Sequence, residues 1–108
     1  MPTNYKVLGQ LEPLSTSGNL YTVPAATQTV VSTINVVNVG TTNSNISIAI
    51  RPGGATLADL HYIVRDIILN PKVTFTYTAG LTLNATDVIT VVSTNNDCAF
   101  SAFGSEVS

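Results

Sequence analysis

Hydrophobic and polar residues alternate along several short segments of the chain. Residues 46–51 read Ile-Ser-Ile-Ala-Ile-Arg, with isoleucine at every second position. Residues 73–78 read Val-Thr-Phe-Thr-Tyr-Thr, with apolar residues alternating with threonine. Because successive side chains of a β-strand point to opposite faces, this period of two predicts strands with one buried face.

The segment 28–39 is apolar at both parities. The pattern places Val30, Ile34 and Val36 on one face of the expected strand, and Val31, Val37 and Val39 on the other. A strand that is apolar on both faces is typically covered on both. We expect a second sheet on one side and a neighbouring subunit on the other.

Extended segments are also expected at residues 5–11, 20–23, 60–66, 88–94 and 98–103, with glycine, proline and asparagine between them. Within residues 60–66, strand parity places Tyr62 and Val64 on the same face. About eight short strands separated by turns predict an all-β, single-domain antiparallel β-sandwich of jelly-roll type. The best helical candidate is a single turn at residues 55–59.

The first nineteen residues differ from the rest because Pro2, Gly9, Pro13 and Gly18 interrupt them. We expect residues 1–19 to form an N-terminal arm that docks on a neighbour, and residues 20–108 to form the sandwich domain. The 108 residues fit one domain of ordinary size.

Charged residues make up 9% of the chain, against about 25% in an ordinary soluble domain. With a net charge of −2 and no basic patch, nucleic-acid binding is not expected. No apolar run is long enough for a membrane helix, and no N-terminal apolar core suggests a signal peptide. The sequence therefore favours synthesis in the cytoplasm and a surface made for uncharged contacts.

Few residues offer catalytic or metal chemistry. His61 is the single histidine, and a catalytic role would need a nucleophile and an orienting carboxylate; a surface or interface hydrogen bond is the expected alternative. The carboxylates are scattered singly, at Glu12, Asp59, Asp66, Asp87, Asp97 and Glu106. We therefore expect no catalytic, cofactor or metal site, and no enzymatic activity.

Three further features have structural interpretations. Asn95-Asn96-Asp97 is acid-poor for a calcium loop and predicts a hairpin turn. Cys98 has small and aromatic neighbours and is expected in the core. Arg51 precedes Pro52-Gly53-Gly54 and is expected to pin that loop by an ion pair with Asp59 or Asp66, with contact to a partner subunit as the alternative.

Four blocks of sequence resemble a family of small virion structural proteins of tailed bacteriophages, especially cyanophages. They are residues 20–25 with 30–34, residues 48–55 leading into 61–63, residues 80–89 and residues 100–106. The resemblance implies a component of a phage particle, assembled in the host cytoplasm, and it carries no catalytic residues. Cys98 and the asparagine-rich turn at 43–45 depart from the family pattern.

The leading hypothesis is a non-enzymatic capsid decoration or cement protein, a homotrimer that binds neighbouring capsid subunits without nucleic acid, membrane or cofactor. A tail, baseplate or fibre component that faces a receptor is the alternative. A small hydrolase that depends on His61 is a third class.

Overall fold

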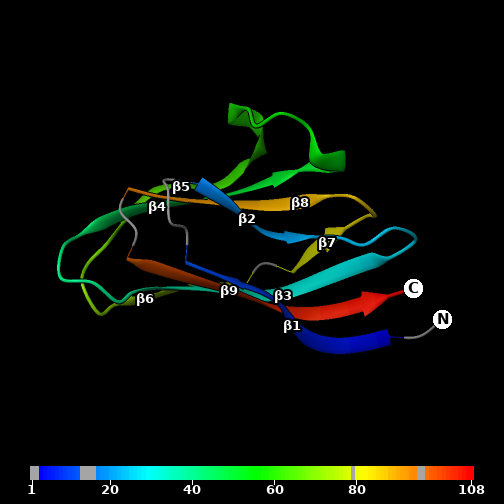
Figure 1. Cartoon of the computed structure of the whole chain (residues 1–108), viewed down its shortest axis with the longest axis horizontal. Coiled ribbons are helices and arrows are strands. Elements are labelled where there is room, and N and C mark those ends of the chain that lie inside the picture. The colour runs from blue at the N-terminus through cyan, green and yellow to red at the C-terminus, as the bar shows by residue number, and fades with distance from the viewer. Residues whose placement is uncertain (1–2, 13–16, 79, 95–96) are drawn as a thin grey trace.

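The computed structural model describes residues 3–12, 17–78, 80–94 and 97–108. They form two antiparallel sheets that lie face to face (Figure 1). Sheet A contains β1 (Thr3–Leu11), β9 (Cys98–Val107), β3 (Gln28–Asn38), β6 (Thr74–Tyr77) and β7 (Leu81–Leu83). Sheet B contains β2 (Ser17–Thr22), β8 (Val88–Ser93), β4 (Ser44–Arg51) and β5 (Tyr62–Leu69).

The strands pair in order from the two ends of the sequence toward its middle. β1 pairs with β9, β2 with β8, β3 with both β6 and β7, and β4 with β5, all antiparallel. Two further pairings, β3 with β9 and β4 with β8, roll this long hairpin into two sheets. This is the topology of a jelly roll, so the expected single-domain, all-β fold is confirmed.

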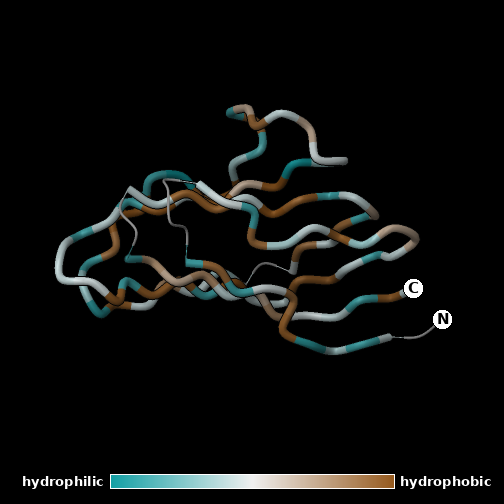
Figure 2. Tube along the Cα trace, viewed as in Figure 1, coloured by the Kyte–Doolittle hydropathy of each residue, from teal (hydrophilic) through white to brown (hydrophobic). Residues whose placement is uncertain are grey.

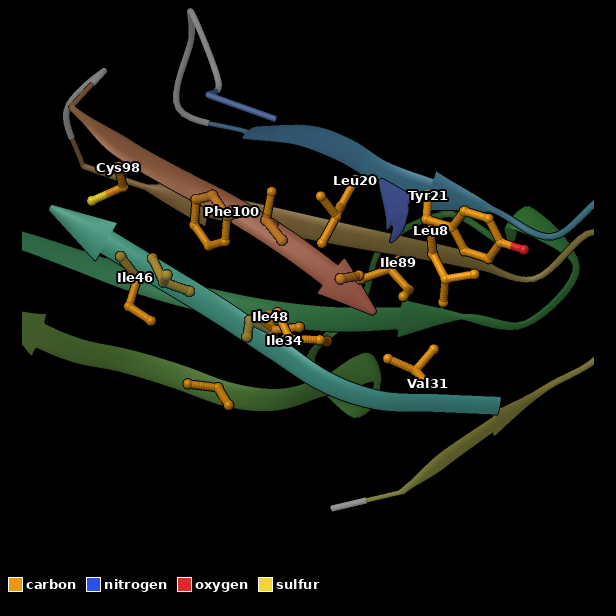
Figure 3. Close-up of a cluster of buried hydrophobic side chains, with 14 of the residues drawn as sticks. Leu8, Leu20, Tyr21, Val31, Ile34, Ile46, Ile48, Ile89, Cys98 and Phe100 are labelled. Carbon is orange, nitrogen blue, oxygen red and sulfur yellow. The ribbon is translucent and has the colours of Figure 1, made fainter. Parts of the chain in front are cut away.

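The core lies between the sheets and consists mainly of aliphatic side chains (Figure 3). Phe100, Ile34, Ile46, Ile48 and Ile89 are among its largest fully buried side chains. Figure 2 shows the hydrophobic stretches concentrated in the strands of both layers. Burying one such side chain stabilises the fold by about 1.5–3 kcal/mol, and packing of this kind holds the sandwich together.

The face assignment expected for β3 was wrong at its first half. Val31, Ile34 and Val36 point into the core, whereas Val30 is 43% exposed on the outer face. A bulge between Val31 and Thr33 adds one residue opposite β9. Since the side-chain period is two, one extra residue moves every earlier side chain to the other face.

Two bulges also change β5. The register against β4 shifts at Ile63 and again near Asp66, whose φ is 53°. Tyr62, expected on the same face as Val64, therefore lies on the outer face with Arg65, whose guanidinium is 4.4 Å from the centre of the tyrosine ring. Val64 remains in the core.

The helical turn expected at residues 55–59 lies elsewhere. Two short 3₁₀ turns, η1 (Pro52–Gly54) and η2 (Asp59–His61), stand on either side of an irregular stretch at 55–58. Gly53 and Gly54 both have positive φ, which interrupts a regular helix at that point. We call residues 52–61 the lobe; it rises from the outer side of sheet B (Figure 1).

The segment expected as an arm contains strand β1, and the expected boundary after residue 19 falls inside β2. β1 is held along β9, and its Leu8 and Leu11 pack against the core.

β7 was not expected as a strand, because Leu-Thr-Leu is too short to show a period. In the described residues, no helix has the length and apolar character needed to cross a membrane.

Candidate interaction surface

The outer face of sheet A carries no charged residue among the strand positions that the structure describes. Strand parity and register assign to this face Thr3, Tyr5, Val7 and Gln10 of β1, the odd-numbered residues 99–107 of β9, and Gln28, Val30, Thr33, Asn35 and Val37 of β3. β6 and β7 add Thr74, Thr76 and Thr82. We call this the uncharged face.

An apolar patch lies within the uncharged face. Tyr5 is 86% exposed, Val7 48% and Val30 43%, and Phe103 is half-buried between them. Phe103 pairs with Val7 on one side and with Thr33 on the other. Neighbouring apolar side chains on three strands of a surface that lacks charge have the composition of an interface centre.

The outer side of sheet B is different, because charged residues lie on it. Arg51 donates from Nε to Thr90 Oγ1 at 2.9 Å and from Nη2 to Asn19 Oδ1 at 3.1 Å. Its Nη1 donates to the carbonyl oxygens of Gly54 and Ala55, at 3.4 and 3.0 Å. Arg51 therefore ties the lobe to the sheet, which confirms the pinned loop expected from the sequence.

The ion pair expected for Arg51 was wrong. Asp66 lies beside Arg65 instead, with an N–O distance of 3.7 Å. The carbonyl groups of the lobe take the place of a carboxylate, because the turn at Pro52–Gly54 brings them to the guanidinium. On the far side of the turn, Asp87 Oδ1 accepts a hydrogen bond from the Gly53 N–H at 2.8 Å.

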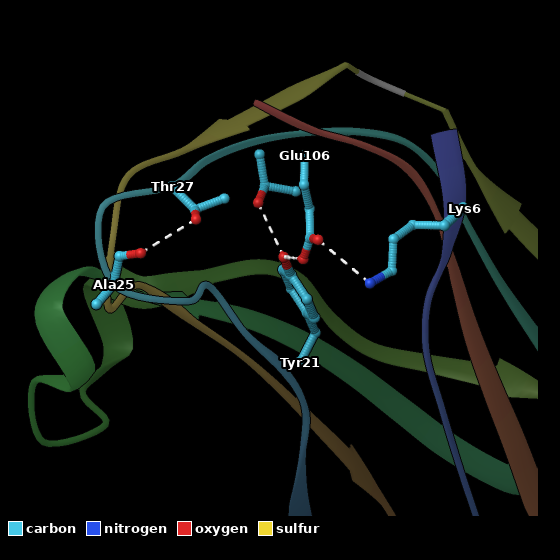
Figure 4. Close-up of polar contacts among 6 residues, drawn as sticks. Lys6, Tyr21, Ala25, Thr27 and Glu106 are labelled. Atoms are coloured by element: carbon cyan, nitrogen blue, oxygen red, sulfur yellow. Dashed lines mark hydrogen bonds and ion pairs between the residues drawn. The ribbon is translucent and has the colours of Figure 1, made fainter. Parts of the chain in front are cut away.

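A polar network closes the end of the sandwich near the C-terminus (Figure 4). The Tyr21 hydroxyl donates to Glu106 and lies 2.9 Å from Thr29 Oγ1. The ammonium group of Lys6 lies 3.2 Å from the other carboxylate oxygen of Glu106. The network connects β1, β2, β3 and β9, and so ties both sheets together.

Burial and the hydrogen bond to Glu106 raise the pKa of Tyr21 to about 12. The hydrogen bond from Tyr21, with a smaller effect from Lys6, lowers the pKa of the Glu106 carboxyl. Both shifts favour a neutral phenol that donates to an ionised carboxylate. A phenol held in its neutral form is suited to a structural hydrogen bond rather than to general-base chemistry.

His61 and Cys98 both lie inside the protein. His61 is 9% exposed, and its Nδ1 accepts a hydrogen bond from the Ala58 N–H at 3.0 Å within the lobe. His61 therefore forms a hydrogen bond, but the bond is internal to the lobe rather than at the surface or interface expected from the sequence. Cys98 is fully buried, as expected, and burial raises the pKa of its thiol.

The remaining titratable side chains do not come together in one site among the described residues. Among the described residues, no three His, Cys, Asp or Glu side chains gather as metal ligands would. A hollow of about 310 Å³ at the end of the sandwich has no titratable side chain in its lining of Ala26, Thr27, Gln28, Asn84, Ala85, Val107 and Ser108. The turn expected at residues 95–97 lies partly outside the described residues.

Two of these features could not be found from the sequence alone. The uncharged face requires the register of β1, β3 and β9, which the bulges alter. The Tyr21–Glu106 contact joins residues 85 positions apart. The low fraction of charged residues was visible in the sequence. The gathering of uncharged residues on the outer face of sheet A was not.

No protein-family model and no curated protein matches the chain. In solved structures, the chain is similar to one in the structure of infectious bursal disease virus, Gx strain, with a TM-score of 0.56 and 11% identity over 97% of this chain. A chain of the T13 particle of that virus gives a TM-score of 0.48 at 10% identity over 96% of this chain. The Gt strain gives 0.46 at 13% over 98%.

This chain spans 32% of the length of the Gx chain, and 30% of each of the other two. At such low identity, the likeness to the Gx chain supports the jelly-roll fold and nothing further. The resemblance to tailed-phage virion proteins remains a prediction.

Proposed function

We propose that this protein is a non-enzymatic structural component of a virus particle. The observation that carries the proposal is the uncharged face on a jelly-roll sandwich. The fold alone does not assign a function, because jelly rolls occur in viral capsid proteins, lectins and cupins. A broad face without charge can be covered by other subunits without the cost of burying ions.

The specific role that we propose is capsid decoration, in which the protein acts as a cement between neighbouring capsid subunits. The apolar patch of Tyr5, Val7, Val30 and Phe103 provides the centre of the contact, and threonine and serine provide its polar rim. We further propose a homotrimer in the virion, assembled in the host cytoplasm. The chain of similar fold in the structure of infectious bursal disease virus is a precedent for this fold in a virus particle.

A lysine at the centre of the patch tests this role. Val30→Lys is expected to abolish co-sedimentation with purified virus particles, because the new ammonium would be buried without a counter-charge. Its matched control is Ile68→Lys, which changes a 65% exposed residue on β5 of sheet B. Wild-type binding by Val30→Lys, in a variant shown to be folded by circular dichroism, would contradict the proposed face.

A cryo-EM map of the virion tests the role itself. Many copies on the capsid lattice would support cement, whereas copies confined to the tail, baseplate or fibre would support the alternative role. If purified virions lack the chain, the virion function is wrong.

A further inference from the structure

The two sheets leave four strand edges, and three of them are protected against pairing with another chain. β5 contains two bulges and carries Arg65 and Asp66. β6 and β7 have only four and three residues, and Gly80 between them has a φ of 67°. β2 has six residues and a register shift between Asn19 and Tyr21. Bulges, short length and charge are the usual means of blocking an edge.

The edge of β1 lacks most of this protection. The strand has nine residues, contains no proline and, in the described structure, pairs only with β9. Its bulge lies between Val7 and Gly9, so the part from Thr3 to Val7 is regular. Lys6 is the one charged residue of β1, and its ammonium group contacts Glu106 on β9. Lys6 therefore does not guard the free edge as an edge lysine usually does.

We propose that β1 pairs antiparallel with β1 of a second copy of this chain, so that two A sheets become one continuous sheet. A two-fold axis through Tyr5 places Tyr5 opposite its own copy, Thr3 opposite Val7, and Asn4 opposite Lys6. An axis through Lys6 would oppose two ammonium groups, which destabilises a strand pair. An axis through Val7 would carry the pairing into the bulge.

We identify the partner as a second copy of this chain, because β1 can pair with itself about a two-fold axis. Tyr5 is the most exposed large hydrophobic residue of the described chain, at 86%. The pairing would bring two such rings together at the centre and would join the two uncharged faces. The pairing uses the backbone edge of β1 and does not depend on a virion role, although the Tyr5 side chain also belongs to the apolar patch.

Cysteine cross-linking of the purified protein tests the pairing and its register. Tyr5→Cys should form a covalent dimer on mild oxidation with oxidised glutathione, because opposite residues on paired strands are within reach of a disulfide. The control is Gln10→Cys, an exposed residue of the same strand and face with no residue opposite it in this register. Native Cys98 is buried and does not compete.

The expected result is a dimer band on a non-reducing gel for most of the Tyr5→Cys chains and few of the Gln10→Cys chains. Equal cross-linking of the two variants, or none in Tyr5→Cys, overturns the proposal. Light scattering of the unmodified protein and of Tyr5→Lys gives a second readout, in which the lysine variant should have half the mass of the unmodified protein. No virus particle enters either measurement, so failure here leaves the virion function standing.

Discussion

The hydroxyl of Tyr21 on β2 donates a hydrogen bond to the carboxylate of Glu106 on β9. The two strands belong to different sheets, so this contact crosses the sandwich rather than following a ladder. Thr29 on β3 lies on the other side of the same hydroxyl. The end of the sandwich is thus closed by a polar contact where the aliphatic core ends.

Replacing Tyr21 by phenylalanine removes that contact and little else. Tyr21→Phe leaves Glu106 without its phenol donor and Thr29 without its hydroxyl partner. We expect a loss of about 1–3 kcal/mol in the free energy of unfolding, measured by urea denaturation. Tyr5→Phe, which changes an exposed tyrosine, should stay within about 0.5 kcal/mol of wild type. Equal effects of the two variants would show that the hydrogen bond adds no stability.

The acid side of the stability profile should depend on Glu106. Its pKa is lowered in the folded state, so its contribution is full above the unfolded value of about 4.3 and is lost as the pH falls through the folded value. Glu106→Gln should therefore be less stable than wild type at pH 6 but lose less stability between pH 6 and pH 3. Urea midpoints at the two pH values measure this.

The matched control for the acid profile is Asp59→Asn in the lobe, which leaves Glu106 and its partners intact. This variant should keep the wild-type difference between the two pH values. If Glu106→Gln shows the same acid loss as wild type, another carboxylate is responsible for it.

The strands could be predicted where the pattern of apolar residues continued along the segment without interruption. Residues 28–39, 46–51 and 88–94 correspond closely to β3, β4 and β8. The bulges were not predictable, because an extra residue at Ser32 is defined only by the partner strand opposite it. Every error in assigning a face, at Val30 and at Tyr62, comes from such a bulge.

The sequence predicted that the protein has an uncharged surface, but not where on the fold that surface lies. A chain with 9% charged residues must expose uncharged area somewhere. Which side that area occupies depends on how β1 aligns with β9, and the extended segment predicted at residues 5–11 did not identify its partner strand. The Arg51 interactions were predictable as a pinned loop, whereas their carbonyl acceptors depend on the backbone of the lobe.

Arg51 should control the order of the lobe more than the stability of the whole sandwich. Arg51→Ala removes the bonds to Gly54, Ala55, Asn19 and Thr90 together. We expect faster amide hydrogen exchange in residues 53–61, measured by mass spectrometry, with protection of β3 and β9 unchanged. Arg51→Lys should give the same increase, because an ammonium group cannot reproduce the guanidinium fork.

Arg65→Ala is the control for the lobe. Arg65 is exposed and contacts Tyr62 and Asp66 rather than residues 52–58. Its removal should leave amide hydrogen exchange in the lobe at the wild-type rate. Faster exchange in both arginine variants would indicate that the lobe responds to any loss of charge on sheet B.

Gly104 marks the point where β9 faces the bulge of β3. It pairs with Val31, and a Cβ built on it would overlap the carbonyl oxygen of Val30 and lie 3.0 Å from the Cα of Val31. Both contacts are to the backbone of a central strand, which has no rotamer by which to move away. Only the absence of a side chain at this position allows the two strands to approach so closely.

Gly104→Ala should therefore destabilise the protein by about 1–3 kcal/mol, as overpacking does in a close-packed interior. Its neighbour Ser105, which faces outwards on the same strand, gives the matched control: Ser105→Ala should change the free energy of unfolding by less than about 0.5 kcal/mol. Urea denaturation of the two variants measures the difference. A Gly104→Ala variant as stable as wild type would mean that the bulge can open to admit a methyl group, and the register of β3 would then have to be fixed elsewhere along its pairing with β9.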